Sequence, residues 1–141
     1  MVFEHEISVR FHHVDRAGIA FFGRTFEYCH DVFEEMLRAG GEPLEGIFER
    51  RGWGMPLVHA EADFSRPLQM GERLRVCVSV ERLGTNSITF AYEVFGAVDG
   101  SLRSRVRLVH AFVSVDGFKK ISLPSELTEA LVRVGVLEEG S

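Results

Sequence analysis

The chain changes its hydrophobic pattern within residues 11–22, which read FHHVDRAGIAFF. Before this stretch, apolar and polar residues alternate from Ile7 to Phe11, which predicts a strand with one apolar face. The stretch then carries one carboxylate, Asp15, followed by Gly18 and the start of an amphipathic segment. Amides at a helix start carry partial positive charge and can hold an oxyanion, while a nearby carboxylate can activate water or attack directly. The junction therefore meets the chemical needs of acyl transfer.

The segment that begins at Phe22 predicts one long helix. Its apolar residues recur at helical spacing, at Phe22, Phe26, Cys29, Phe33, Met36 and Leu37. Charged residues form the opposite stripe, at Glu27, Asp31, Glu34 and Arg38. We expect Glu34 to pair with Arg38 one turn later, and Gly40-Gly41 followed by Pro43 to end the helix.

The remainder of the chain is rich in strands. We predict a short helix at residues 44–49 and strands that begin near residues 57, 74, 88 and 106, separated by turns at 67–71, 84, 99–100 and 116–117. Because strands joined by short turns are antiparallel neighbours, the pattern predicts a meander with the long helix inserted after its first strand. The phenylalanines on the helix favour a sheet that curls around it.

Length, charge and cysteine content narrow the class of protein. With 141 residues and 45% hydrophobic content, the chain predicts a single domain over residues 1–141. A net charge of -5 argues against a nucleic-acid partner. The acidic start and the lack of a long apolar run predict no membrane segment and a cytoplasmic location. Cys29 and Cys77 lack CxxC spacing and the six histidines are scattered, so neither a disulfide nor a metal site is expected.

The order of these elements resembles the hotdog-fold acyl-CoA thioesterases of the 4-hydroxybenzoyl-CoA thioesterase type, over roughly residues 3–124. The segment Asp15–Ile19 looks like the Asp-x-x-Gly loop of that family. Residues 29–34 (CHDVFE) and 56–64 (PLVHAEADF) are similar to the 1,4-dihydroxy-2-naphthoyl-CoA hydrolases of quinone biosynthesis. The resemblance implies an α+β hotdog fold, in which an antiparallel sheet of about five strands wraps around one long central helix.

The resemblance also implies how the protein works. Asp15 corresponds to the catalytic carboxylate, Phe22 to the residue whose backbone N–H polarises the thioester carbonyl, and Gly18 to the glycine of the loop. Two copies would join edge to edge with active sites at their interface, and such dimers commonly pair into tetramers. No cofactor is implied, because coenzyme A is part of the substrate. Phe22 stands where some short-chain relatives have a histidine, which argues against that subgroup. Thr25 stands where many members have a tyrosine that belongs to the acyl pocket.

Several residues invite both a functional and a structural interpretation. Asp15 alone reads as a turn or helix-capping residue, and Gly18 supplies either a special backbone conformation or room for close approach. His59 either lines the acyl site or sits on a polar sheet face. The adjacent His12 and His13, sent to opposite faces by a strand, are expected to be structural.

The candidate binding residues also have both a functional and a structural interpretation. Lys119-Lys120, which follow the turn at 116–117, and Arg66 beside Pro67 either bind the phosphates of coenzyme A or belong to a solvated surface. Phe21, Phe26, Trp53 and Phe64 contact an aromatic acyl group or belong to the core.

The preferred function is hydrolysis of an aromatic acyl-CoA, with 1,4-dihydroxy-2-naphthoyl-CoA of menaquinone or phylloquinone biosynthesis as first choice. Alternatives are 4-hydroxybenzoyl-CoA or a broad range of short- and medium-chain acyl-CoAs. A hotdog dehydratase would need a histidine paired with an acid on the helix, and a non-catalytic acyl-binding module would not need Asp15.

Overall fold

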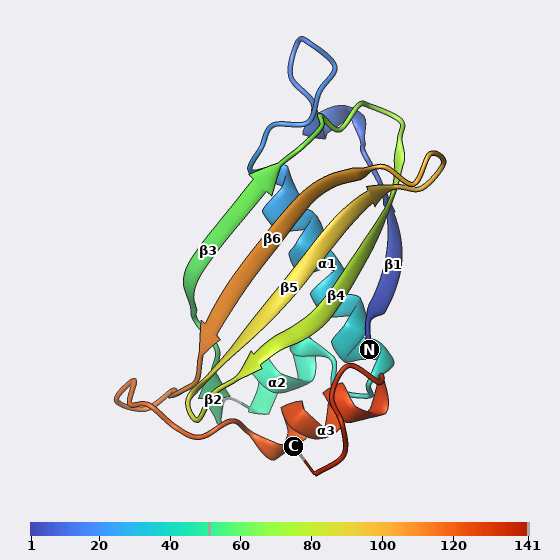
Figure 1. The fold of residues 1–141 in the computed structure, drawn as a ribbon. Helices are drawn as coiled ribbons and strands as arrows, with labels where there is room; N and C mark the ends of the chain where they lie inside the picture. Colours follow the sequence, from blue (N-terminus) through green and yellow to red (C-terminus); the bar gives the residue numbers. More distant parts are fainter. Residues whose placement is uncertain (51, 141) are drawn as a thin grey trace.

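The computed structural model describes residues 1–50 and 52–140 (Figure 1). Its helices are α1 (Arg24–Ala39), α2 (Leu44–Arg50) and α3 (Ser125–Arg133). Its strands are β1 (Phe3–Ser8), β2 (Trp53–Gly54), β3 (Leu57–Phe64), β4 (Arg73–Leu83), β5 (Ser87–Gly96), β6 (Leu102–Ala111) and β7 (Val113–Ser114). α2 confirms the short helix expected at 44–49, whereas α3 has no counterpart in the sequence prediction. Within the described residues, no helix is long and apolar enough to cross a membrane.

A five-stranded antiparallel sheet forms the body of the molecule, in the order β1-β4-β5-β6-β3 (Figure 1). β4, β5 and β6 make the predicted meander. β3, however, lies at the far edge and pairs with β6, from Leu57 opposite His110 to Phe64 opposite Ser104. The prediction that β3 and β4 are neighbours is therefore wrong, because the segment 65–72 crosses the end of the sheet and does not close a hairpin.

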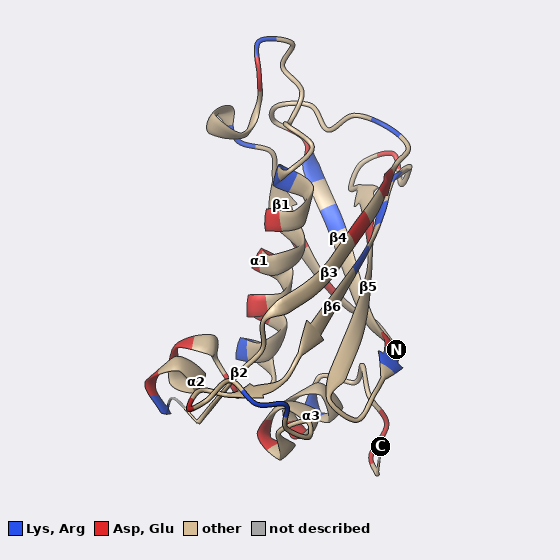
Figure 2. Cartoon of the chain, turned by 90° about the vertical axis from the view of Figure 1, so that its left-hand side faces the viewer, with Lys and Arg blue, Asp and Glu red and all other residues tan. Residues whose placement is uncertain are grey.

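The helix α1 packs along one face of the sheet (Figures 1 and 2). Its buried residues are Thr25, Tyr28, Cys29, Val32, Phe33, Met36 and Leu37. The ring of Phe33 lies 5.2 Å from that of Phe90 on β5, centroid to centroid. Each large apolar side chain so buried contributes about 1.5–3 kcal/mol to folding. The predicted apolar stripe is confirmed from Cys29 onward, but Phe22 precedes α1 and is exposed.

The C-terminal end of α1 is fixed differently from the sequence prediction. Gly40 is its C-cap, as expected. Arg38, however, bonds to Glu45 of α2 with Nη2 2.9 Å from Oε2, and no contact with Glu34 occurs among the described residues. The predicted pair is wrong because α2 folds back beside the last turn of α1 and supplies the carboxylate.

The first strand is shorter than its alternating pattern predicts. β1 ends at Ser8, and a 3₁₀ turn occupies Phe11–His13. The amide of Arg10 donates to Nδ1 of His13 over 3.0 Å, so a side chain takes the donor that a longer strand would use. His12 and His13 consequently do not lie on opposite faces of a strand, and their ring centroids are 4.2 Å apart.

Candidate active site

Asp15 opens a tight hairpin at one end of the sheet. Its amide donates to the carbonyl of Ile19 and its own carbonyl accepts from Gly18, both over 3.0 Å. The Asp15 Oδ1 atom accepts the amide of Ala17 at 2.8 Å, while Oδ2 accepts no hydrogen bond from the described residues. Asp15 does not cap α1, because the N-cap of that helix is Gly23. The carboxylate is thus held by one oxygen and is free at the other.

Gly18 is required by the backbone of this hairpin. Its φ angle is +77°, in the left-handed region that side chains disfavour, and a Cβ atom there would meet nothing within 4 Å. Of the two interpretations of Gly18, the conformational one therefore holds. The hairpin is also tied to the segment before β4: the amide of Ala20 donates to Leu68 over 2.7 Å, and Gly18 accepts from Met70 over 3.0 Å.

The N-terminus of α1 presents unused backbone donors. The helix begins at Arg24, and Gly23 supplies no side-chain cap. The amides of Phe22 and Gly23 donate no hydrogen bond within the described residues, whereas those of Arg24 and Thr25 donate to the carbonyls of Phe21 and Phe22. Free amides at the positive end of a helix dipole stabilise negative charge. This agrees with the role expected for the backbone of Phe22, and it adds Gly23, which sequence patterns do not distinguish from an ordinary helix start.

Two hollows flank the neighbouring rings of Phe21 and Phe22, whose centroids are 4.5 Å apart. The first, of about 440 Å³, is lined by residues that include His13, Asp15, Phe21 and Gly23. The second, of about 280 Å³, is lined by residues that include Phe22, Thr25, Phe64 and Arg66. The structure therefore gathers most of the predicted site residues around the start of α1, on either side of the two phenylalanines.

The aromatic candidates divide between site and core. Phe21, Phe22 and Phe64 are 57%, 61% and 50% exposed, although they are large apolar residues. Trp53 instead packs in the core, with its ring centroid 5.8 Å from that of Phe112. The exposed rings mark the surface around the two hollows as a site for an apolar partner.

His13 belongs to the same region, although its sequence context indicates a structural residue. Its ring lines the hollow of Asp15, and its Nδ1 lies 2.8 Å from the hydroxyl of Tyr28. Tyr28 is buried on α1, and burial raises the pKa of its phenol to about 12. Tyr28 comes fifteen residues after His13, so no local pattern indicates this contact.

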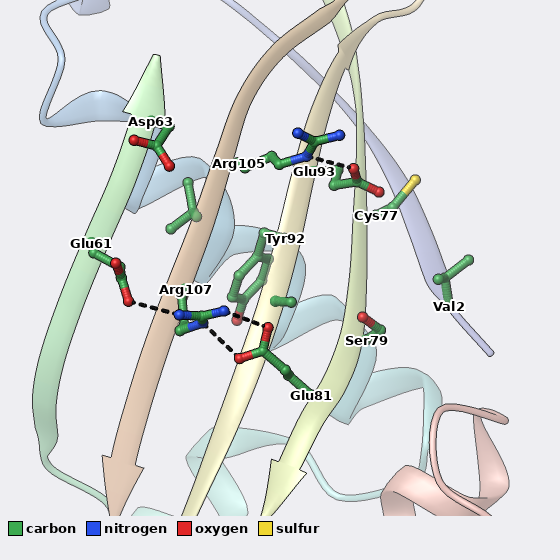
Figure 3. A pocket seen from close by; sticks show the side chains of 12 residues that line it. Val2, Glu61, Asp63, Cys77, Ser79, Glu81, Tyr92, Glu93, Arg105 and Arg107 are labelled. Atoms are coloured by element: carbon green, nitrogen blue, oxygen red, sulfur yellow. Dashed lines mark hydrogen bonds and ion pairs between the residues drawn. The ribbon is translucent and has the colours of Figure 1, made fainter. Parts of the chain in front are cut away.

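His59 lies on the outer face of the sheet, opposite α1. Its Nε2 atom is 3.3 Å from the carboxylate of Glu61. That carboxylate contacts Arg107 at 3.1 Å, and Arg107 in turn contacts Glu81 (Figure 3). The guanidinium of Arg107 lowers the pKa of Glu61. Within one protomer, His59 thus belongs to an ion-pair network on a polar face and not to the hollow of Asp15.

Lys119 and Lys120 belong to the segment that follows β7, and this segment lies at the other end of the sheet from the loop that joins β1 to α1 (Figure 1). Their segment pairs with β7, which follows the C-terminal end of β6, whereas the hairpin of Asp15 bonds to the segment after β3. With a rise of about 3.3 Å per residue, the length of β3 separates these ends by roughly 25 Å. A single protomer therefore does not bring the two lysines to Asp15.

The described residues contain neither a disulfide nor a cluster of metal-ligating side chains. Cys29 and Cys77 are buried free thiols, and burial raises the pKa of both, that of Cys77 to about 11. Within residues 1–50 and 52–140, no three side chains of metal-ligating type gather. The expectation that the reaction needs no metal or cofactor stays a prediction.

Known proteins are similar to this chain in sequence and in fold. The model of the thioesterase-like superfamily matches residues 9–131. A 1,4-dihydroxy-2-naphthoyl-CoA hydrolase from Nostoc punctiforme is 30% identical over 131 residues, which are 93% of this chain and 87% of the relative. The hydrolase of the same name from Synechocystis is 28% identical over 92% of this chain and 94% of its own.

The crystal structure of a 1,4-dihydroxy-2-naphthoyl-CoA thioesterase from Synechocystis has a TM-score of 0.87 to this chain at 27% identity, covering 93% of this chain and 96% of that one. The antiparallel sheet and its helices therefore form a hotdog-like thioesterase fold. The chain belongs to the thioesterase-like superfamily and is a thioester hydrolase.

Proposed function

We propose that this enzyme hydrolyses an aromatic acyl-CoA, and that its substrate is 1,4-dihydroxy-2-naphthoyl-CoA of menaquinone or phylloquinone biosynthesis. The substrate is supported by the names of the Nostoc and Synechocystis relatives, which align over most of both chains. The observation that carries the chemistry is the hollow that Asp15 shares with Gly23, at a helix start with two free amides.

In the proposed reaction, the thioester carbonyl oxygen accepts the amide of Phe22. Asp15 then either takes a proton from water or attacks the carbonyl carbon itself. Where Asp15 acts as a base, the water oxygen bonds to the carbonyl carbon, the carbon–sulfur bond breaks, and the proton held by Asp15 passes to the departing thiolate, so that the acid and coenzyme A are released. Where Asp15 attacks, the carbon–sulfur bond breaks to give an anhydride between Asp15 and the acyl group, and water then hydrolyses this anhydride, which releases the acid, restores Asp15 and supplies the proton of the coenzyme A thiol. One backbone donor to the oxyanion is worth about 10²–10³ in rate. Because a thiolate leaves readily, this pair of groups is sufficient for turnover.

The remaining candidates would form the walls around these groups. Phe21 and Thr25 lie on the two hollows and would contact the acyl group or its linker. Arg66 is exposed at the rim of the second hollow, where its guanidinium can bind a phosphate of coenzyme A through paired hydrogen bonds.

We also propose that two copies join through β3, and that the dimers pair into a tetramer. β3 is an edge strand of the sheet, and nearly all of its residues are exposed. Apolar side chains stand at both ends, with Val58 59% and Phe64 50% exposed. A two-fold axis that pairs β3 with its copy makes the strands antiparallel. The end of one sheet that carries Asp15 would then lie beside the end of the other that carries Lys119-Lys120, so the partner could supply the phosphate contacts.

Two further parts of the proposal concern the whole chain. We place the enzyme in the cytoplasm, since free cysteines are typical of a reducing compartment. We also treat residues 1–141 as one domain.

The decisive experiment measures thiol release from a panel of aromatic and aliphatic acyl-CoAs by the wild-type enzyme and Asp15→Asn. We expect the aromatic substrates to be preferred and the substitution to lower kcat by about 10²–10⁴, the usual contribution of a general base. Asp116→Asn, at an exposed turn, is the matched control and should keep full activity. An active Asp15→Asn enzyme would refute the role of Asp15, and a preference for aliphatic chains would refute the substrate.

A further inference from the structure

The ring of His13 receives two hydrogen bonds at a single nitrogen. The amide of Arg10 lies 3.0 Å from Nδ1, and a backbone amide can only donate. The hydroxyl of Tyr28 lies 2.8 Å from the same atom. Since Nδ1 already accepts from Arg10, it carries no proton, and the Tyr28 hydroxyl must donate to it as well.

This arrangement fixes the tautomer of His13. In a neutral imidazole with an unprotonated Nδ1, the proton resides on Nε2. A second proton, on Nδ1, would point at the Arg10 amide, which can only donate, and would break that hydrogen bond; the hydroxyl of Tyr28 would then have to accept from Nδ1. Desolvation and the neighbouring His12 and Arg24 also lower the pKa of His13. His13 is consequently a neutral ring with one N–H donor on the side away from Tyr28.

His13 is one of the residues that line the hollow of Asp15. His13 and Asp15 both line it, yet they form no contact with each other within hydrogen-bonding or ion-pair distance. The Nε2 atom of His13 has no acceptor among the described residues, and it is not sealed in the core. The cationic Arg24 in the same hollow is already paired with Glu27 at 2.7 Å. The lining of the hollow therefore includes, besides Asp15, a neutral imidazole whose Nε2–H has no acceptor.

We propose that the Nε2–H of His13 donates to the carbonyl oxygen of the pantetheine amide next to the thioester. This inference rests on the proposed function, since it assumes that Asp15 faces the thioester carbon. In an acyl-CoA, an ethylene group joins the sulfur to that amide, so the amide must pass close to groups that line the same hollow. A neutral donor suits a neutral amide carbonyl, whereas a phosphate is bound more strongly by a charged donor.

Two substitutions separate this contact from the structural role of the ring. His13→Asn places an amide oxygen near the position of Nδ1, where it can still accept from Arg10 and Tyr28, but it removes the donor at Nε2. His13→Gln places amide N–H groups near the position of Nε2 but removes the acceptor at Nδ1. We expect the thermal unfolding midpoint of His13→Asn to stay near that of the wild type, and that of His13→Gln to fall.

The test compares two thioesters of the same aromatic acid, one of N-acetylcysteamine, which retains the amide, and one of ethanethiol, which lacks it. We expect His13→Asn to lower kcat/KM for the first about tenfold, mainly through KM, and to leave the second unchanged. His13→Gln should keep the preference of the wild type for the amide-containing thioester. Equal losses on both thioesters, or no loss on either, would overturn the proposal.

Titration of coenzyme A by calorimetry provides a readout that does not depend on turnover. His13→Asn should weaken binding of coenzyme A about tenfold. Wild-type affinity in His13→Asn would overturn the proposal for His13 alone. An enzyme that hydrolyses no thioester would overturn the proposed function, and the titration would still decide whether His13 contacts the pantetheine arm.

Discussion

Replacing Arg103 by methionine should destabilise the segment 65–72, which lines the candidate active site, although Arg103 itself does not line either hollow. The Arg103 side chain is only 7% exposed, and it grips the carboxylate of Glu72 with both terminal nitrogens, at 2.5 and 3.1 Å. It also donates to the carbonyl of Pro67 at 3.1 Å. Arg103 thus joins β6 to the segment 65–72, which carries Arg66 and holds the hairpin of Asp15 through Leu68.

The size of the effect follows from these contacts. Breaking a buried ion pair typically costs about 3–5 kcal/mol, because the remaining charge is left without a partner. Glu72 is 29% exposed and can be partly rehydrated, so we reduce the expected loss for Arg103→Met to about 2–3 kcal/mol. Methionine retains most of the apolar stem, so little packing is lost. At roughly 3 °C per kcal/mol, the unfolding midpoint should fall by about 6–9 °C.

The loss of stability in Arg103→Met should depend on pH, whereas a loss of packing alone would not. Arg103 lowers the pKa of Glu72 below its usual value of 4.5. The stabilisation is therefore complete above pH 4.5 and is lost as the pH falls through the lower pKa of the folded state. The difference between wild type and Arg103→Met should be constant from pH 7 to about 5 and shrink below that.

Urea denaturation followed by circular dichroism at a fixed protein concentration measures the unfolding free energy, and repeating it from pH 7 to pH 3 measures its pH dependence. The double variant Arg103→Met/Glu72→Gln is the control, and it should be more stable than Arg103→Met because the unpaired carboxylate is gone. A loss below about 0.5 kcal/mol for Arg103→Met, the level of an ordinary surface substitution, would refute the reasoning. So would a difference that does not change between pH 7 and pH 3.

Other changes test separate parts of the structure. Gly18→Ala forces a side chain into the left-handed region, so the unfolding free energy should fall by about 1 kcal/mol and kcat/KM should fall with it; an unchanged unfolding curve would contradict this. Leu108→Ala empties a fully buried position on β6 and should destabilise the protein by about 2–5 kcal/mol in urea. Val58→Arg should dissociate the proposed dimer in sedimentation velocity, whereas Val98→Arg, 86% exposed away from β3, should not; dissociation by both or by neither would count against the interface.

Local patterns predict the elements that local interactions decide. The helix α1 follows from apolar spacing because one face of it, around Phe33 and Met36, is buried. Its end at the glycine pair follows as well, because Gly41 adopts a φ angle of +81°, in the left-handed region that only glycine enters freely. The sequence predicts that Asp15 and Phe22 lie beside a helix start, and the structure places both there.

Contacts between distant segments are what the sequence alone does not reveal. The position of β3 depends on a connection over the end of the sheet, which turn residues at 67–71 do not distinguish from a hairpin. The charges do contain a signal, since Glu61 and Asp63 lie opposite Arg107 and Arg105 in the antiparallel register. Matching acids on one predicted strand with arginines on another would have favoured the observed pairing.

The early end of β1 and the hydrogen bonds of His13 have a common cause. The Nδ1 atom of His13 accepts a hydrogen bond from the amide of Arg10 and contacts the hydroxyl of Tyr28 on α1. Alternation from Ile7 to Phe11 describes only which residues are apolar. It contains no information on how an imidazole competes with a neighbouring strand for one backbone donor.

The edge position of β3 has a consequence for a protomer that stays alone. Backbone donors and acceptors along its outer side are a template on which further chains can add as strands, and its apolar ends at Val58 and Phe64 favour that addition. Unpaired chains are therefore prone to aggregate. In a host cell, a variant that only weakens self-recognition along this strand should collect in inclusion bodies, and a low yield of soluble material would precede any measurable defect in turnover.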